Sequence, residues 1–239
     1  MPRWASTPVI CLVTDRQVLT DAVPGEDDAT LERLLDVVGQ CVDAGVDLVQ
    51  IREAGLSDHR LVELVRRAVE RARGTRARVL VNDRADIALA AGAHGVHLKD
   101  DRRSAARVRT LGPRHWIVGR SVHGLDGALR ADRSDPVDYL LAGTALATPS
   151  KPGRAPLGLH ALHAIAGAVA CPVLAIGGIG VAEARVLAAT GVAGLAGIRL
   201  FRAGTTQPGA LSIAERLRAV REAFARGREE NGAAQLSGR

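Results

Sequence analysis

The sequence predicts a single (β/α)8 TIM barrel, and three observations carry this prediction. Eight short runs rich in Val, Ile and Leu recur along the 239 residues, which is typical of parallel strands covered on both faces. Segments with apolar residues three and four positions apart separate these runs, as in amphipathic helices. Glycine recurs between helix and strand in AGVDLV (44–49), AGAHGVH (91–97) and TGVAGLA (190–196), where a helix end favours a left-handed residue. An open doubly wound sheet is the alternative arrangement.

Strands and helices are expected to alternate along the whole chain. The runs predicted to form strands are VICLVTD (9–15), VDLVQIRE (46–53), RVLVND (78–83), GVHLK (95–99), WIVGRSVH (116–123), VDYLLAGT (137–144), PVLAIGGI (172–179) and GLAGIRLF (194–201). Two of the intervening helices show their apolar stripes clearly, as Leu31, Leu34, Leu35 and Val38 and as Leu61, Leu64, Val65 and Val69. Such helices are the crossover connections that parallel strands require.

No linker divides the chain, so residues 1–225 are expected to form one domain. The polar, glycine-containing segment 226–239 is expected to be a disordered tail. Cys11, Cys41 and Cys171 lie in apolar runs without the spacing of metal ligands, as core thiols of a reducing compartment would. The sequence shows neither a signal peptide nor a membrane-length apolar stretch, which predicts a cytoplasmic protein without membrane contact.

The composition argues against nucleic acid as a partner. Aromatic residues make up 2% of the chain, too few for platforms on which bases stack. The net charge of +6 comes from arginines interleaved with Asp and Glu, which is typical of a solvated surface. The oligomeric state stays open, and a homo-oligomer is compatible with the sequence.

Polar residues end six of the predicted strands, where barrel enzymes place their sites. These residues are Thr14 and Asp15, Gln50 with Arg52 and Glu53, Asn82 with Asp83, His97 with Lys99 and Asp100, Ser121 with His123, and Thr148 with Ser150 and Lys151. Turns and helix caps account for one such pair, but ionisable groups after successive strands favour a substrate site. For Gln50, Arg52 and Glu53 the alternative is a buried ion-pair cluster, although arginine at a strand end suits carboxylate or phosphate.

Two glycine-containing segments near the last strands predict a phosphate site. Gly177 and Gly178 follow the seventh strand, and Gly197 with Ile198 ends the eighth. Loops at these positions of a barrel commonly bind phosphate through backbone N–H groups, and glycine lets the ligand approach closely. Lys151 lies in a loop with Pro149, Pro152 and Gly153, which we interpret as a functional lid.

Several motifs together resemble one family. TPSKPGRAPLGL, IGGI, VQIRE, VNDRADIALA, GVHL and GRSVH are similar, in consistent order from about Val9 to Phe201, to the thiamine phosphate synthase and thiazole tautomerase superfamily. The resemblance implies a barrel fold, a role in thiamine biosynthesis and a small phosphorylated thiazole-type substrate.

The synthase branch joins a pyrimidine diphosphate to a thiazole phosphate and expels pyrophosphate, with Mg²⁺ and several cations absorbing the charge. Its strand-two motif ends in a pyrophosphate-binding lysine, where this chain has Ala54. The resemblance implies Asp83 as one metal ligand, but the second falls on Arg102, so that Asp100 or Asp101 would have to replace it.

The TenI-like tautomerase branch moves one proton within a thiazole carboxylate phosphate, which requires an acid/base group and no metal. Its GRSVH motif implies His123 as that group, and imidazole is a side chain that commonly transfers protons at neutral pH. We therefore expect a metal-independent, cofactor-free isomerase. The residues expected to bind its substrate are Gln50, Arg52, Glu53, Asn82, Ser121, Thr148, Ser150 and Lys151, with Gly177, Gly178, Gly197 and Ile198 on the phosphate. A synthase using Mg²⁺ on Asp83 and Asp101 is the first alternative, and a non-catalytic, regulatory binder of thiamine-related phosphates is the second.

Overall fold

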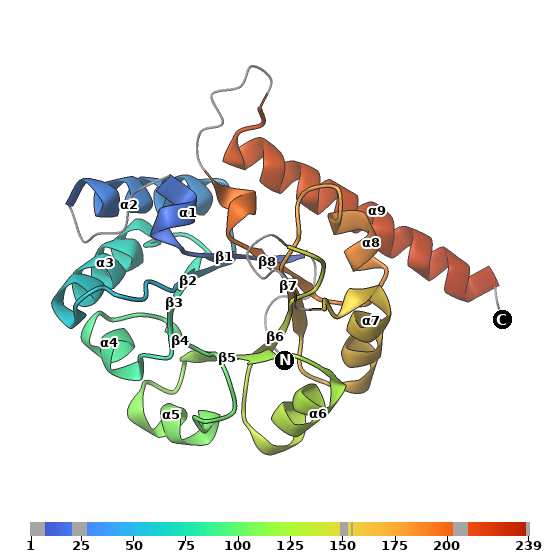
Figure 1. Ribbon diagram of the computed structural model, residues 1–239, viewed down its shortest axis with the longest axis horizontal. Coiled ribbons are helices and arrows are strands. Elements are labelled where there is room, and N and C mark those ends of the chain that lie inside the picture. The colour runs from blue at the N-terminus through green and yellow to red at the C-terminus, as the bar shows by residue number, and fades with distance from the viewer. Residues whose placement is uncertain (1–7, 21–27, 149–152, 154, 203–209, 238–239) are drawn as a thin grey trace.

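Eight parallel strands close into a barrel in sequence order, which confirms the predicted (β/α)8 fold (Figure 1). The computed structural model describes residues 8–20, 28–148, 153, 155–202 and 210–237. The strands are β1 (Val9–Val13), β2 (Leu48–Ile51), β3 (Arg78–Asn82), β4 (Gly95–Leu98), β5 (Ile117–Val122), β6 (Tyr139–Gly143), β7 (Val173–Ile176) and β8 (Gly194–Gly197). Strand β1 pairs with β2 on one side and with β8 on the other, so the described sheet has no open edge.

Helices surround the barrel on its outside (Figure 1). They are α1 (Arg16–Thr20), α2 (Asp28–Asp43), α3 (Asp58–Arg71), α4 (Ala85–Ala90), α5 (Ala105–Leu111), α6 (Leu125–Ser134), α7 (Gly158–Ala168), α8 (Ala184–Ala188), the 3-10 helix η1 (Arg199–Phe201) and α9 (Ile213–Ser237). The stripe predicted on α2 is buried against the sheet, because Leu31, Leu34, Leu35 and Val38 are all at most 7% exposed.

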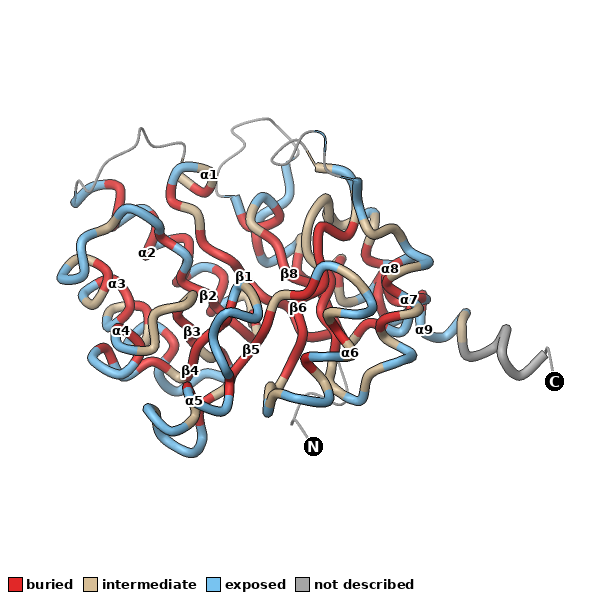
Figure 2. Tube along the Cα trace, turned by 60° about the horizontal axis from the view of Figure 1, so that its bottom comes forward, coloured by how far each residue is buried: buried red, intermediate tan, exposed pale blue. Residues whose placement is uncertain are grey.

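Side chains fill the interior of the barrel, and the strands form the buried centre of the molecule (Figure 2). Leu48, Leu80, Tyr139 and Leu174 are completely buried there. Tyr139 fits because its neighbour on β5 is glycine: a Cβ on Gly119 would lie 2.1 Å from the Tyr139 ring. The interior is therefore a packed core, and a ligand site has room only at the ends of the strands.

Helix α9 runs through most of the segment that the sequence analysis expects to be a disordered tail. The boundary predicted at residue 225 falls inside this helix, which continues to Ser237. Its buried face includes Leu217, Val220 and Phe224. Close packing continues beyond that boundary, since a Cβ on Gly227 would lie 2.1 Å from the Arg185 carbonyl oxygen of α8. The polar composition of 226–239 hid this helix because charged residues such as Glu and Arg are good helix formers.

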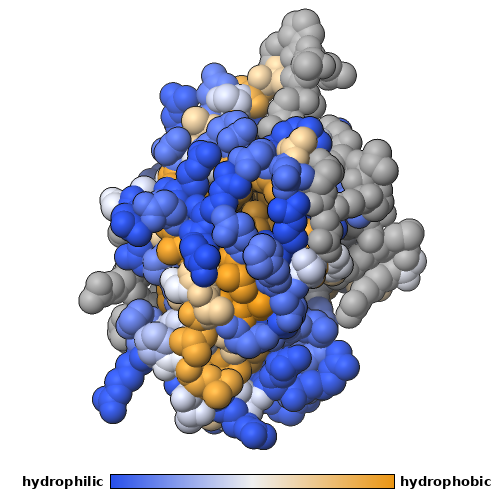
Figure 3. All heavy atoms as spheres, turned by 90° about the vertical axis from the view of Figure 1, so that its left-hand side faces the viewer, coloured by the Kyte–Doolittle hydropathy of each residue, from blue (hydrophilic) through white to orange (hydrophobic). Residues whose placement is uncertain are grey.

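Ion pairs between neighbouring helices use much of the arginine charge. Arg67 of α3 lies 2.5 Å from Glu32 of α2, and Arg71 lies 3.6 Å from Asp36. Hydrophilic side chains cover most of this outer face, with hydrophobic ones showing between them (Figure 3). None of the helices in the described part of the chain is both long and apolar enough to cross a membrane.

Candidate active site

A cavity of about 810 Å³ lies at the C-terminal ends of the strands. Ten of the predicted site residues line it, namely Gln50, Arg52, Asn82, Ser121, His123, Thr148, Gly177, Gly178, Gly197 and Ile198. Ser150 and Lys151 lie outside the described residues. Side chains from opposite sides of the barrel thus meet in one concave site.

The predicted phosphate-binding backbone forms one side of this cavity. Gly177 and Gly178 follow β7 with φ angles of +105° and +69°, a region that side chains other than glycine rarely enter. A Cβ on Gly178 would also lie 2.4 Å from the Ala147 carbonyl oxygen. Gly197 and Ile198 line the same cavity at the end of β8, and the exposed Arg199 follows them. Close backbone approach and a nearby guanidinium together suit an anion.

An amide pair lies on the opposite side of the cavity. Gln50 Nε2 donates a hydrogen bond of 2.8 Å to Asn82 Oδ1. Gln50 is only 2% exposed, and its Oε1 has no hydrogen-bond partner among the described residues. A buried acceptor without a partner is costly, so this oxygen is available to accept a hydrogen bond from a ligand.

Ser121 is held in place by a buried histidine. His97 lies 2.8 Å from Ser121 Oγ through Nε2 and 2.9 Å from the Tyr139 hydroxyl through Nδ1. Burial lowers the His97 pKa to about 3, with a smaller contribution from Arg120. The ring is therefore neutral at physiological pH, with one nitrogen donating and the other accepting. Ser121 alone of the three lines the cavity, so His97 positions rather than contacts a ligand.

His123 lies at the rim, directly after β5. Its Nδ1 is 2.5 Å from the Gly143 carbonyl oxygen. A carbonyl oxygen only accepts, so Nδ1 carries a proton, and in the neutral ring Nε2 is left as an acceptor.

Glu53 is the described site residue that does not line the cavity. Its Oε2 forms a buried ion pair of 3.0 Å with Arg16, which connects the end of β2 to the start of α1. Burial raises the Glu53 pKa, and hydrogen bonds from Thr14 and Arg16 oppose that shift. For Glu53 the buried ion-pair alternative is what the structure shows, whereas Gln50 and Arg52 line the cavity.

Three cationic residues that line the cavity were missing from the set predicted to bind substrate: Lys99, Arg102 and Arg199. Lys99 and Arg102 follow β4, and Arg199 opens η1. The signal that points to them is their place within five residues of a strand end, but exposed loop cations are common and carry little specificity.

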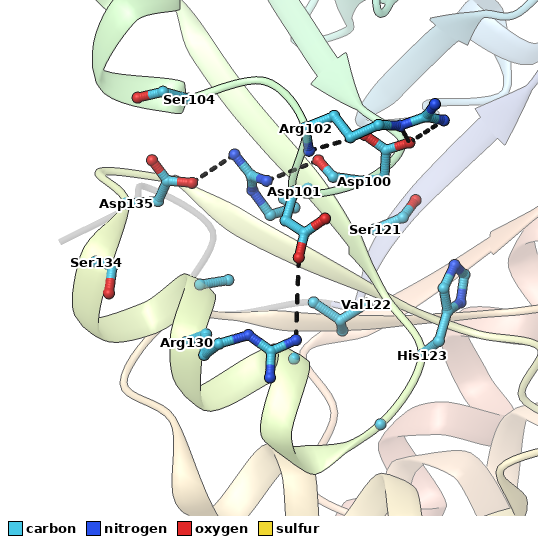
Figure 4. Close-up of a pocket in the computed structure, with 14 residues that line it drawn as sticks. Asp100, Asp101, Arg102, Ser104, Ser121, Val122, His123, Arg130, Ser134 and Asp135 are labelled. Carbon is cyan, nitrogen blue, oxygen red and sulfur yellow. Dashed lines mark hydrogen bonds and ion pairs between the residues drawn. The ribbon is translucent and has the colours of Figure 1, made fainter.

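The carboxylates expected to bind Mg²⁺ are already compensated by cations. Asp83 Oδ2 lies 3.3 Å from Lys99 Nζ, and Asp83 Oδ1 accepts a hydrogen bond of 3.0 Å from the Lys99 backbone. Asp101 does not line the cavity and faces Arg130 at 4.0 Å (Figure 4). The described residues contain no group of three or more His, Cys, Asp or Glu able to hold a metal. These donors do not fit a Mg²⁺ ion, which takes free carboxylate oxygens in near-octahedral geometry.

The family model for thiamine monophosphate synthase (TMP-TENI) matches residues 20–201. The chain belongs to this family. Within the thiamine monophosphate synthase family, the chain is 44% identical over 156 residues to the thiamine-phosphate synthase of Solidesulfovibrio magneticus, covering 65% of this chain and 69% of that protein. It is 36% identical over 191 residues to the Chlorobium luteolum thiamine-phosphate synthase, covering 80% and 83%. The solved thiamine phosphate pyrophosphorylase from Pyrococcus furiosus superimposes with a TM-score of 0.72 at 28% identity, covering 91% and 96%.

These relatives overturn the expectation of a tautomerase. Family members between 34% and 44% identical to this chain are named thiamine-phosphate synthase, so the isomerase prediction, with His123 as its acid/base group, is wrong. That prediction depended mainly on Ala54 and Arg102. Both residues lie in exposed loops after strands. Substitutions in such loops can change which side chains neutralise a ligand's charge, while the other sequence motifs of the family stay the same.

Proposed function

We propose that the protein is a thiamine-phosphate synthase, a transferase that joins a pyrimidine diphosphate to a thiazole phosphate. The observation that carries this proposal is the distribution of cations around one cavity. Arg52, Lys99 and Arg102 follow β2 and β4, and Arg199 follows β8 with the glycine backbone beside it. Two anionic groups on separate substrates fit two such clusters.

The reaction forms one C–N bond and breaks one C–O bond. The lone pair of the thiazole ring nitrogen forms a bond to the methylene carbon of the pyrimidine. The electron pair of the broken C–O bond leaves on an oxygen of pyrophosphate. Negative charge grows on the leaving group, so fixed cations beside it lower the barrier. Arg52, Lys99 and Arg102 are the candidates for this role.

The barrel order separates the two anions. Strand β3 lies between β2 and β4, and across the barrel from β7. Pyrophosphate is assigned to the side of Arg52, Lys99 and Arg102, and the thiazole phosphate to Gly177, Gly178, Gly197, Ile198 and Arg199. Ser121 and His123 at the end of β5 and Thr148 after β6 line the cavity between these two sides, and Gln50 and Asn82 line it on the pyrophosphate side. We assign the two rings to the space beside these residues.

His123 has a different role here from the one expected. The coupling transfers no proton to or from the thiazole nitrogen, so an acid/base group is unnecessary. With Nδ1 donating to the Gly143 carbonyl, Nε2 is an acceptor at the rim. We assign His123 to substrate contact together with Ser121.

The test is to incubate the full chain with both phosphorylated substrates and to quantify thiamine phosphate and pyrophosphate. Equimolar formation of the two products is expected, and it should persist in the Arg67→Ala variant, whose arginine pairs with Glu32 on the outer face. Binding of both substrates without product would contradict the proposal.

A further inference from the structure

We infer that Lys99 and Arg102 supply, from the chain itself, the positive charge that holds and stabilises pyrophosphate, so that this step does not depend on a divalent cation. This inference rests on the proposed function. It concerns where the compensating charge comes from, and so it can fail while the coupling activity stands.

Lys99 is held in place by the carboxylate of Asp83. Asp83 adopts a φ of +59° and donates its backbone N–H to the His97 carbonyl at 2.8 Å, which holds it at the end of β3. Its Oδ1 accepts from the Lys99 backbone, and its Oδ2 pairs with Lys99 Nζ. Asn82 Nδ2 approaches Oδ2 at 3.4 Å. Both carboxylate oxygens of Asp83 are therefore bound by groups of the chain, and Asp83 holds Lys99 at the edge of the cavity.

Arg102 is held in the same way by the carboxylate of Asp100. Asp100 Oδ2 lies 2.7 Å from Arg102 Nε and 2.6 Å from Nη2, and Asp100 Oδ1 accepts from the Arg102 backbone at 3.1 Å (Figure 4). Hydrogen bonding by Arg102 lowers the Asp100 pKa, which keeps the carboxylate ionised. Arg102 Nη1 has no partner among the described residues and remains a donor for a ligand.

The exposure of the two pairs makes them ready to exchange partners. The side chains of Lys99 and Arg102 are 58% and 76% exposed, while Asp83 and Asp100 are 11% and 28% exposed. Exposed ion pairs contribute little to stability, so the ammonium and guanidinium can shift to share their remaining N–H donors with diphosphate oxygens while staying beside their carboxylates. The less exposed partners, the carboxylates, remain as the fixed part that orients the cations.

The same arrangement opposes a divalent cation at this place. A Mg²⁺ ion within reach of Asp83 or Asp100 would lie beside the ammonium or guanidinium that already neutralises it, and like charges repel strongly at such distances. Asp101, the remaining carboxylate of the loop, points toward Arg130 and away from the Asp100 and Arg102 pair (Figure 4). The chain thus places two cations where a metal site would need free oxygen ligands.

The test is calorimetric titration of the full chain with sodium pyrophosphate, once in EDTA and once in MgCl2. We expect Mg²⁺ not to tighten binding, and each of Lys99→Ala and Arg102→Ala to weaken binding in EDTA at least tenfold. Arg130→Ala is the matched control, because Arg130 pairs with Asp101 outside the mouth cavity, and it should bind as the unchanged chain does. Thermal unfolding of each variant verifies folding.

A second variant tests for a gain of Mg²⁺-dependent binding, so that the conclusion does not depend only on variants that lose affinity. Arg102→Asp introduces a carboxylate beside Asp100, so pyrophosphate binding should be lost in EDTA and partly recovered with Mg²⁺. The inference is overturned if Mg²⁺ raises the pyrophosphate affinity of the wild-type protein more than tenfold. It is also overturned if Arg102→Ala binds pyrophosphate as tightly as the wild type does. Coupling that occurs only with Mg²⁺ also overturns it and leaves the proposed function standing. If pyrophosphate binds without a metal but no thiamine phosphate forms, the inference stands and the proposed function is overturned.

Discussion

His97 Nε2 lies 2.8 Å from Ser121 Oγ, so a fully buried ring on β4 holds a hydroxyl of β5 at the cavity. Tyr139 completes this arrangement from β6 by contacting His97 Nδ1 at 2.9 Å. The chain of three polar groups connects the packed interior of the barrel with the site.

Tyr139→Phe should destabilise the protein and also slow the coupling. Loss of the hydroxyl leaves His97 Nδ1 buried without this partner, which costs about 1–3 kcal/mol in the free energy of unfolding. Urea unfolding measures that loss. Ser121→Ala is the comparison: it should lower kcat for coupling with a smaller loss of stability, because Ser121 is only half-buried. Equal kcat in Ser121→Ala and the unchanged chain would rule out the assigned contact.

The depressed pKa of His97 predicts loss of stability in mild acid. The folded ring titrates at about 3, whereas an unfolded histidine titrates near 6.5. Between these pH values the unfolded chain binds a proton that the folded chain does not, so the contribution is fully present above 6.5 and is lost as the pH falls toward 3. The slope from this group approaches about 1.4 kcal/mol per pH unit. Urea unfolding at pH 7 and pH 5 should show a smaller difference in His97→Asn than in the unchanged chain.

Gly178→Ala should impair binding of the thiazole phosphate and also destabilise the fold. The residue has a φ of +69°, and its Cβ would lie 2.4 Å from the Ala147 carbonyl oxygen. Alanine at such a position costs more than about 1 kcal/mol. Gly127→Ala on α6 is the control, since its nearest neighbour is 3.9 Å away and alanine favours a helix. KM for the thiazole phosphate, measured in both variants, should rise only in the first.

Arg199→Ala should raise KM for the thiazole phosphate and leave pyrophosphate affinity unchanged. Its guanidinium follows Gly197 and Ile198, across the barrel from Lys99 and Arg102. A hydrogen bond to a charged group contributes about 1.5–3 kcal/mol, which corresponds to roughly tenfold or more in KM. Steady-state kinetics with each substrate varied in turn provide the measurement. A rise in KM for the pyrimidine diphosphate instead would reverse the assignment of the two anions.

The fold was predictable because the sequence shows continuous apolar runs for the strands and apolar residues three and four positions apart for the helices. Apolar runs such as 9–15 and 194–201 read as strands buried on both faces, and they pair as β1 and β8. The end of α9 was not predictable, because its close packing depends on Gly227 meeting Arg185, a contact between distant parts of the chain. A polar composition alone does not distinguish a surface helix from a tail.

The site was predictable as far as strand ends determine it. Gln50 and Arg52 line the cavity whereas Glu53 does not, as expected when extended chain directs alternate side chains to opposite faces. The pairing of Asp83 with Lys99 was not predictable, because whether a carboxylate is free for a metal depends on a side chain from the loop after the neighbouring strand. A motif shows which residue types are present but not which charges already neutralise one another.

Tyr139 is the chain's single tyrosine, and it lies at the centre of the barrel. Burial holds its pKa well above the ordinary value for a phenol. In alkaline solution we therefore expect the phenolate absorption band to develop together with opening of the barrel. The protein carries an intrinsic optical reporter of the integrity of its own sheet, placed one hydrogen bond away from the histidine that positions Ser121.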